Sequence, residues 1–260
     1  PRRASERLGP QESRRYDSAG VAIFDDGEFA VLSRSGVQIT DTEGHLVERA
    51  PRTIQWDPVS AEKGGYDRFM QKEIFEQPRA IRDTIGTRVR QDDGGLDLDG
   101  IDLSFEAVNK IERIFLIACG TAYYSCLVGK YMIEQLAGIP AEVDLASEFR
   151  YRRPIVDGSC LVVPVSQSGE TADPLAALRE GKRSGARVLS ICNVRDSTIA
   201  RESHDVLYTH AGPEIGVAST KAFTTQLVVH YLLALKLAAA RKTIAEEEVE
   251  AALADLRRLP

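Results

Sequence analysis

The chain has 260 residues, of which 43% are hydrophobic and 28% charged, and this length can bury a sizeable core. Its 39 acidic and 33 basic residues give a formal net charge of -6, with no basic block, which argues against a nucleic-acid partner. No apolar run reaches the roughly 20 residues of a membrane span, and the first ten residues lack a signal-peptide core. We therefore expect a cytoplasmic protein with no membrane partner.

The first 55 residues are charged and irregular. Two candidate strands, 20–24 and 28–33, flank Asp25-Asp26-Gly27, a sequence typical of a hairpin turn. This segment is too short for a complete domain, and we expect it to be poorly packed.

Residues 61–88 predict two helices in a linker or arm. Phe69, Ile74, Ile81 and Ile85 recur at near-helical spacing. Pro78 should end the first helix because proline cannot donate a backbone hydrogen bond. Gly94-Gly95 then marks the boundary of the arm.

Beyond Gly100 the pattern alternates regularly between strands and helices. The predicted strands are 113–118, 141–145, 161–165, 187–192 and 205–209, and the predicted helices are 122–136, 172–182 and 218–239. The strands are apolar throughout, which is typical of strands covered on both faces. We predict an α/β domain over residues 101–240, a three-layer αβα sandwich with a five-stranded parallel sheet, whose ligands bind beyond the carboxyl ends of the strands.

The cysteines and histidines are scattered along the chain. The chain has four cysteines and four histidines, with no Cys-x-x-Cys pair and no spacing typical of metal ligands. They are Cys119, Cys126, Cys160 and Cys192, and His45, His204, His210 and His230. We expect reduced thiols in the core and no metal site.

Two loops rich in hydroxyl groups follow the first and third predicted strands of this domain. They are Cys119-Gly120-Thr121-Ala122 and Ser166-Gln167-Ser168-Gly169-Glu170-Thr171. Each precedes a helix, whose free N–H groups and partial positive charge favour a phosphate. Glu170 would repel a phosphate, so we expect it to point away. In the alternative interpretation Ser168 only caps the helix.

Three longer motifs resemble one known family. They are ACGTAYYSCLVGKYMIEQLAGIPAEVDLASEFRYR (118–152), SQSGETADPLAALR (166–179) and EIGVASTKAFTTQL (214–227). Together they resemble the first sugar isomerase (SIS) domain of the glutamine:fructose-6-phosphate aminotransferases, also called glucosamine-6-phosphate synthases. Residues 66–85 resemble the segment that enters the isomerase half of that family.

The resemblance implies a set of sugar-phosphate-binding residues. Ser166, Gln167, Ser168 and Thr171 match the residues that hold the phosphate. Thr121 matches a residue near the sugar, and Ala122 replaces the serine that usually follows it, which puts one sugar contact in doubt.

Val217, Ala218 and Ser219 match a loop that closes beside the substrate, although a plain loop before a buried helix is the alternative. Lys221 resembles an imine-forming lysine, but in this family that lysine belongs to the C-terminal tail. We expect a structural role for Lys221.

The sequence departs from the family at both ends. The family uses an N-terminal cysteine to release ammonia from glutamine, whereas this chain begins with Pro1 and has no cysteine before Cys119. We expect residues 1–55 to be a remnant of the glutaminase domain, 56–100 a helical linker, 101–240 the first SIS domain, and 241–260 the start of a helical connection. The second SIS domain, with its acid/base and imine residues, is expected to be missing, so no catalytic residue is assigned.

The family makes glucosamine 6-phosphate from fructose 6-phosphate and glutamine without a cofactor. The resemblance therefore implies that this chain binds fructose 6-phosphate or glucosamine 6-phosphate without turnover. A non-catalytic sugar-phosphate sensor and an inert fragment remain alternatives. We also expect a homodimer, because residues 227–237 form an apolar helix and because the second domain that would cover this half is expected to be missing.

Overall fold

The computed structural model describes residues 27–33, 36–48, 62–89, 95–98 and 100–260. The chain forms two compact units, residues 1–55 and residues 56–260, and each is described by itself.

The described part of the first unit is an antiparallel hairpin. Strand β1 (Glu28–Ser33) pairs with β2 (Gly36–Asp41), in a register that runs from Glu28 opposite Asp41 to Ser33 opposite Gly36. The strand predicted at 28–33 is confirmed, but the sequence analysis missed β2, and the strand predicted at 20–24 lies outside the described residues. Phe29 and Val31 are exposed, so this hairpin buries little apolar surface.

The second unit begins with the two predicted helices of the arm. Helix α1 spans Phe69–Phe75 and α2 spans Gln77–Ile85, followed by a 3-10 turn, Gly86–Arg88. Pro78 lies in the first turn of α2, where a missing N–H breaks no helical hydrogen bond. The break predicted at the proline therefore falls at Glu76, immediately before the second helix.

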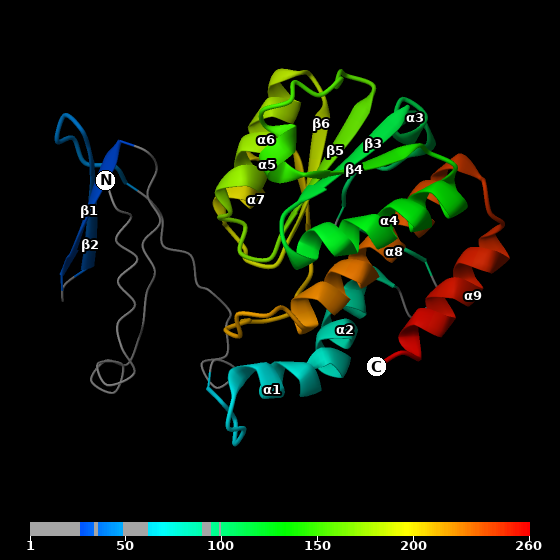
Figure 1. Ribbon diagram of the computed structural model, residues 1–260, viewed down its shortest axis with the longest axis horizontal. Helices are drawn as coiled ribbons and strands as arrows, with labels where there is room; N and C mark the ends of the chain where they lie inside the picture. Colours follow the sequence, from blue (N-terminus) through cyan, green and yellow to red (C-terminus); the bar gives the residue numbers. More distant parts are fainter. Residues whose placement is uncertain (1–26, 34–35, 49–61, 90–94, 99) are drawn as a thin grey trace. The chain divides into compact units, whose positions relative to one another are not determined.

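A five-stranded parallel sheet forms the centre of this unit (Figure 1). Its strands are β3 (Arg113–Ala118), β4 (Ala141–Leu145), β5 (Cys160–Ser166), β6 (Arg187–Cys192) and β7 (Asp205–Tyr208). Their order in the sheet is β4-β3-β5-β6-β7. The predicted five-stranded parallel sheet is confirmed, and the strand order reverses between β3 and β5.

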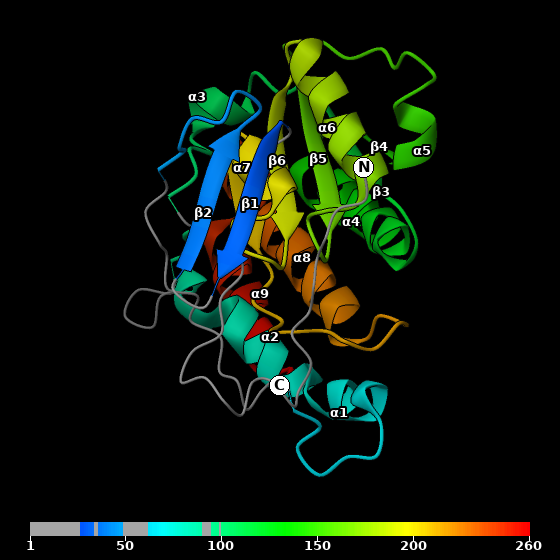
Figure 2. The same cartoon turned by 90° about the vertical axis from the view of Figure 1, so that its left-hand side faces the viewer.

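Helices cover both faces of the sheet, which gives three layers (Figure 2). One core cluster joins the sheet to α4 (Thr121–Ala137), α8 (Lys221–Arg241) and α9 (Glu246–Arg257), with the short α3 (Phe105–Val108) beside α8. The other joins it to α5 (Ala146–Phe149), α6 (Ala172–Arg183) and α7 (Thr198–Glu202).

Alternate residues of one strand supply the two core clusters. On β3, Ile114 and Leu116 belong to the α4/α8 cluster, and Phe115 and Ile117 belong to the α5/α6/α7 cluster. Because successive side chains point to opposite faces, an apolar strand can fill both layers. This explains why the strands read as unbroken apolar runs.

Helix α8 is a core helix. It is long and apolar enough to cross a bilayer, yet 67% of its most apolar window is buried inside the protein. Val228, Leu232, Leu233 and Leu237 are all buried in the α4/α8 cluster. The apolar helix that we gave as a reason for self-association is therefore not exposed, and that reason is wrong.

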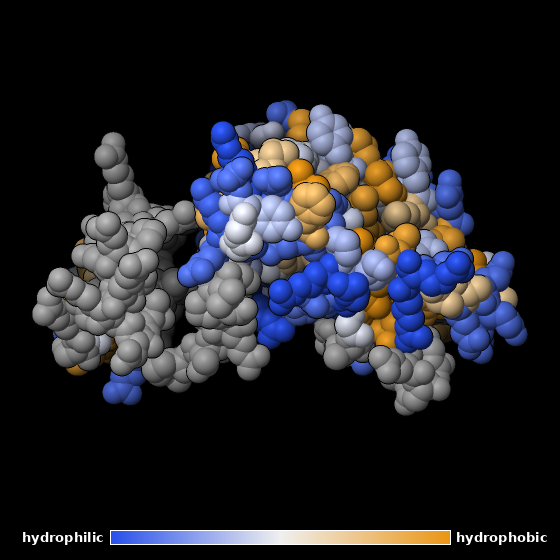
Figure 3. Space-filling model, turned by 90° about the horizontal axis from the view of Figure 1, so that it is seen from below, coloured by the Kyte–Doolittle hydropathy of each residue, from blue (hydrophilic) through white to orange (hydrophobic). Residues whose placement is uncertain are grey.

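On the face shown in Figure 3, hydrophobic residues lie among hydrophilic ones. Met70, Ile74 and Phe75 of α1 are exposed. The four cysteines are free thiols, and three are buried as predicted, but Cys119 is only half-buried.

Candidate functional site

The reversal of strand order places two loops beside each other at one edge of the sheet. From β3 the chain moves outward to β4 and then returns to β5 on the other side of β3. The loops that follow β3 and β5 therefore diverge and leave a crevice, which is where open α/β sheets bind their ligands.

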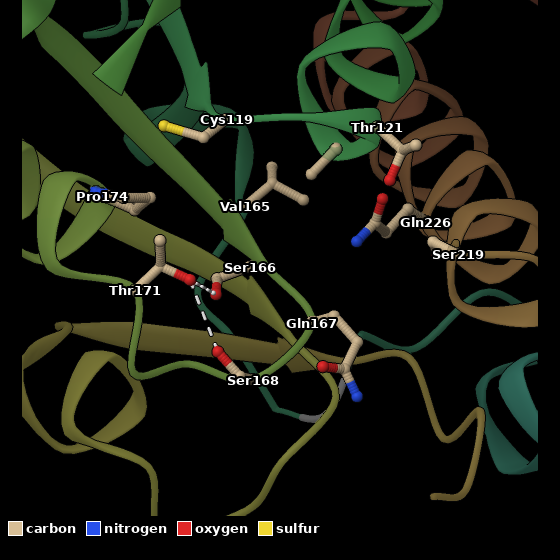
Figure 4. A pocket seen from close by; sticks show the side chains of 11 residues that line it. Cys119, Thr121, Val165, Ser166, Gln167, Ser168, Thr171, Pro174, Ser219 and Gln226 are labelled. Carbon is tan, nitrogen blue, oxygen red and sulfur yellow. Dashed lines mark hydrogen bonds between the residues drawn. The ribbon is translucent and has the colours of Figure 1, made fainter. Parts of the chain in front are cut away.

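A pocket of about 170 Å³ occupies this crevice (Figure 4). Seven of the nine residues predicted to bind sugar phosphate line it. They are Thr121, Ala122, Ser166, Gln167, Ser168, Thr171 and Ser219. The remaining lining residues, Cys119, Val165, Pro174 and Gln226, were not predicted.

Three hydroxyl groups converge in the loop between β5 and α6. The Thr171 hydroxyl oxygen lies 3.2 Å from that of Ser166 and 3.4 Å from that of Ser168 (Figure 4). Ser166 also accepts a hydrogen bond from the backbone N–H of Gly169 (3.0 Å), and Ser168 accepts one from Glu170 N–H (3.2 Å). The loop is thus held by its own serines.

The interpretation that Ser168 only caps α6 is wrong. The N-cap residue of α6 is Thr171, and its side chain makes no capping hydrogen bond. The first turn of α6 therefore presents its positive dipole end to the pocket without a capping side-chain oxygen.

Gly169 allows this loop to lie against the start of α7. Its φ is +66°, and a Cβ atom at this position would lie 2.0 Å from the Ser197 hydroxyl oxygen. Both the backbone conformation and the close contact therefore require glycine.

Two carboxylates near the loop are engaged with other groups. Glu170 accepts hydrogen bonds from the N–H (2.7 Å) and the hydroxyl (2.8 Å) of Thr198, at the start of α7. Asp173, in the first turn of α6, forms an ion pair with Arg150 at 2.7 Å, and this hydrogen bond raises the pKa of Arg150. Glu170 points away from the pocket, as expected, and does not line it.

The opposite wall of the pocket comes from α4 and α8. Thr121 is the first residue of α4, and Ala122, 8% exposed, presents a methyl group to the pocket. Ser219 precedes α8, and its hydroxyl donates to the Glu214 carboxylate at 3.1 Å. Gln226 comes from the second turn of α8.

The loop before α8 has only one residue in the pocket. Val217 and Ala218 are exposed and do not line it, in contrast to Ser219. Val217 is the most exposed large apolar residue among those described. These two residues lie in an exposed part of the loop.

Carboxylates on both sides hold this loop in place. Glu73 of α1, 2% exposed, accepts hydrogen bonds from the backbone N–H groups of Ile215 (2.6 Å) and Gly216 (3.0 Å). Glu214 accepts from the N–H groups of Thr220 (2.9 Å) and Ala222 (3.2 Å).

Lys221 has a structural contact. Its side chain is 3% exposed, and its ammonium group lies 2.7 Å from the Glu76 carboxylate, between α2 and α8. It does not line the pocket, which agrees with the role that we expected.

Comparison with known proteins gives the class of this fold and site. Residues 108–236 match the SIS domain family. The chain is 41% identical to the structure titled C-terminal domain of glucosamine-fructose-6-phosphate aminotransferase from Francisella tularensis, with a TM-score of 0.70 over 76% of this chain and 55% of that chain. The chain therefore contains a SIS domain.

Curated relatives identify the family within that class. The glutamine–fructose-6-phosphate aminotransferases (isomerizing) of Clostridium tetani and Clostridium acetobutylicum are 50% and 52% identical to 92% of the chain. The predicted resemblance to this family is confirmed over 92% of the chain. The chain spans 39% of the length of these relatives.

Proposed function

We propose that the pocket at the β3/β5 crevice holds a phosphorylated sugar, fructose 6-phosphate or glucosamine 6-phosphate. The observation that carries this proposal is the convergence of Ser166, Ser168 and Thr171 at the uncapped start of α6. In this reading the chain is the sugar-phosphate-holding part of a cytoplasmic aminotransferase that makes glucosamine 6-phosphate.

The phosphate is held by neutral donors. No lysine or arginine lines the pocket, so hydroxyl groups, backbone N–H groups and the α6 dipole supply the attraction. Each neutral hydrogen bond contributes about 0.5 to 1.5 kcal/mol, and the helix end about 0.3 to 1 kcal/mol. A few such contacts correspond to a dissociation constant on the order of millimolar.

Turnover needs groups that the lining of this pocket does not supply. Moving a proton between neighbouring sugar carbons requires a positioned base. The residues that line the pocket include no carboxylate, imidazole or amine. We propose that these residues bind and orient the sugar without cofactor, and that proton transfer belongs to other parts of the whole aminotransferase.

The first prediction tests the phosphate contact. Titration calorimetry with fructose 6-phosphate should show binding to the chain, and Ser168→Ala should weaken it about tenfold, because one hydrogen bond of about 1.4 kcal/mol is lost. Lys221→Ala is the control, since Lys221 lies outside the pocket lining, and its affinity should be nearly unchanged. Equal affinity for the wild type and Ser168→Ala would place the phosphate elsewhere.

The same preparation distinguishes the alternatives. Absence of binding to either sugar phosphate would favour an inert fragment. Glucosamine 6-phosphate formed from fructose 6-phosphate and ammonium would show that catalytic groups are present after all.

A further inference from the structure

Gln226 is a buried polar residue on the wall of the pocket. It is 3% exposed and lies between two threonines and the apolar residues 227–229 of α8. Its amide oxygen is fully buried and has no hydrogen-bond partner among the described residues. Figure 4 shows the amide group directed into the pocket, near Thr121 and Ser219.

An unpartnered buried amide oxygen is costly. A buried group without a partner has lost its hydrogen bonds to water and gained none in return, and buried polar groups are paired in the great majority of cases. A ligand that donates a hydrogen bond at this position would remove that cost.

The chemistry of the missing partner follows from the amide oxygen. An amide oxygen only accepts hydrogen bonds, so its partner must be a donor. The phosphate group of a sugar monophosphate has no proton to donate once it is a dianion, whereas every sugar hydroxyl has one. The serine and threonine hydroxyls of the β5–α6 loop line the other side of the pocket (Figure 4).

We propose that Gln226 binds a hydroxyl group of the sugar and thereby makes the pocket select a phosphorylated sugar over inorganic phosphate. The inference rests on the proposed function, because it assigns the phosphate to the β5–α6 loop. The sugar then lies against α4 and α8, where Ala122 offers no hydroxyl and Gln226 supplies a polar contact.

The test compares two ligands on one variant. Gln226→Met keeps the length and volume of the side chain and removes its amide. Its affinity for fructose 6-phosphate should fall about tenfold, the effect of one lost hydrogen bond, while its affinity for inorganic phosphate stays within about twofold. Gln71→Met, the same replacement at an exposed position of α1, should change neither affinity.

A measurement on the wild type does not depend on how the variant folds. In NMR spectra, the side-chain amide signals of Gln226 should shift on addition of fructose 6-phosphate and stay in place on addition of inorganic phosphate. Signals that do not move with the sugar phosphate would overturn the inference.

The outcomes separate this inference from the proposed function. If the wild type binds neither ligand, the proposed function fails and the role of Gln226 fails with it. If the wild type binds fructose 6-phosphate and Gln226→Met binds it equally well, only the role of Gln226 is overturned. The role of Gln226 is also overturned if the wild type binds fructose 6-phosphate no more tightly than inorganic phosphate.

Discussion

Gly169 restricts the shape of the loop between β5 and α6. A side chain there meets a positive φ and a Ser197 hydroxyl oxygen 2.0 Å from the Cβ position. We expect Gly169→Ala to lower the free energy of unfolding by more than the roughly 1–2 kcal/mol of left-handed strain alone, and to abolish detectable binding of fructose 6-phosphate.

Gly138→Ala is the matched control. Gly138 has nearly the same φ, +63°, but nothing lies within 4 Å of its Cβ position. Urea unfolding of both variants should show that Gly169→Ala lowers the free energy of unfolding clearly more than Gly138→Ala does. Equal losses would show that the loop moves away from Ser197 without difficulty.

The complete burial of His230 predicts that the protein loses stability in mild acid. It is completely buried between α8 and α4, where a Cβ atom on Gly129 would lie 2.7 Å from its ring, and Ser125 Oγ lies 3.5 Å from its Nε2 atom. Burial lowers its pKa from 6.5 to about 4. Between these two values the unfolded chain binds a proton that the folded chain does not, so stability falls as the pH falls.

From pH 7 to pH 5, this one group should cost about 2 kcal/mol, at about 1.4 kcal/mol per pH unit below 6.5. His230→Gln removes the titrating ring, so its free energy of unfolding should change less over the same interval. Urea titrations at both pH values measure the difference. If the wild type and His230→Gln lose the same free energy of unfolding between pH 7 and pH 5, His230 is not the source of the pH dependence.

The sequence predicted one wall of the site better than the other. Ser166, Ser168 and Thr171 are close in sequence and follow one strand, so their convergence could be foreseen. Gln226 follows Thr224 and Thr225 in a mostly apolar helix, and this pattern gives no sign of the direction in which the amide points. That direction depends on how α8 packs against α4, which is set by tertiary contacts.

At the scale of elements, the loop before α8 depends on the arm that precedes the sheet. Glu73 of α1 holds the N–H groups of Ile215 and Gly216, and Ser219 of the same loop lines the pocket. We expect Glu73→Ala to speed amide hydrogen exchange at residues 215 and 216 and to weaken sugar-phosphate binding severalfold, because the N–H groups of this loop lose their acceptor.

Glu73→Gln keeps one acceptor oxygen in the same place, so it should retain more protection than Glu73→Ala. Glu106→Ala, on α3, serves as a control for the loss of a negative charge. Unchanged exchange at 215 and 216 in Glu73→Ala would mean that other contacts hold the loop.

The strands were predicted more completely than the short helices. The bounds of β3, β4 and β6 agree with the predicted 113–118, 141–145 and 187–192. The helices α3, α5 and α7, of 4 or 5 residues each, were missed. Helices this short contain little more than one turn, so no periodic pattern can develop, and tertiary packing stabilises them.

At the scale of the whole molecule, self-association remains a prediction, but it now rests on the exposed side chains of α4 and no longer on α8. Helix α8 is buried, but Tyr124, Val128 and Tyr131 of α4 are exposed at a spacing that places them along one face. We expect sedimentation to show a dimer at micromolar concentration, and Tyr131→Lys to shift it toward monomer. A wild-type protein that sediments only as a monomer would contradict this.

The hydrogen bond between Glu73 and Ile215 also has a consequence for the order of folding. It joins positions separated by 142 residues, whereas neighbouring strands of the sheet, such as β5 and β6, are close in sequence. Contacts between distant positions form slowly, because the intervening chain must close a long loop first. During refolding, the wall of the pocket that contains Ser219 should therefore assemble after the sheet, and ligand binding should recover later than secondary structure.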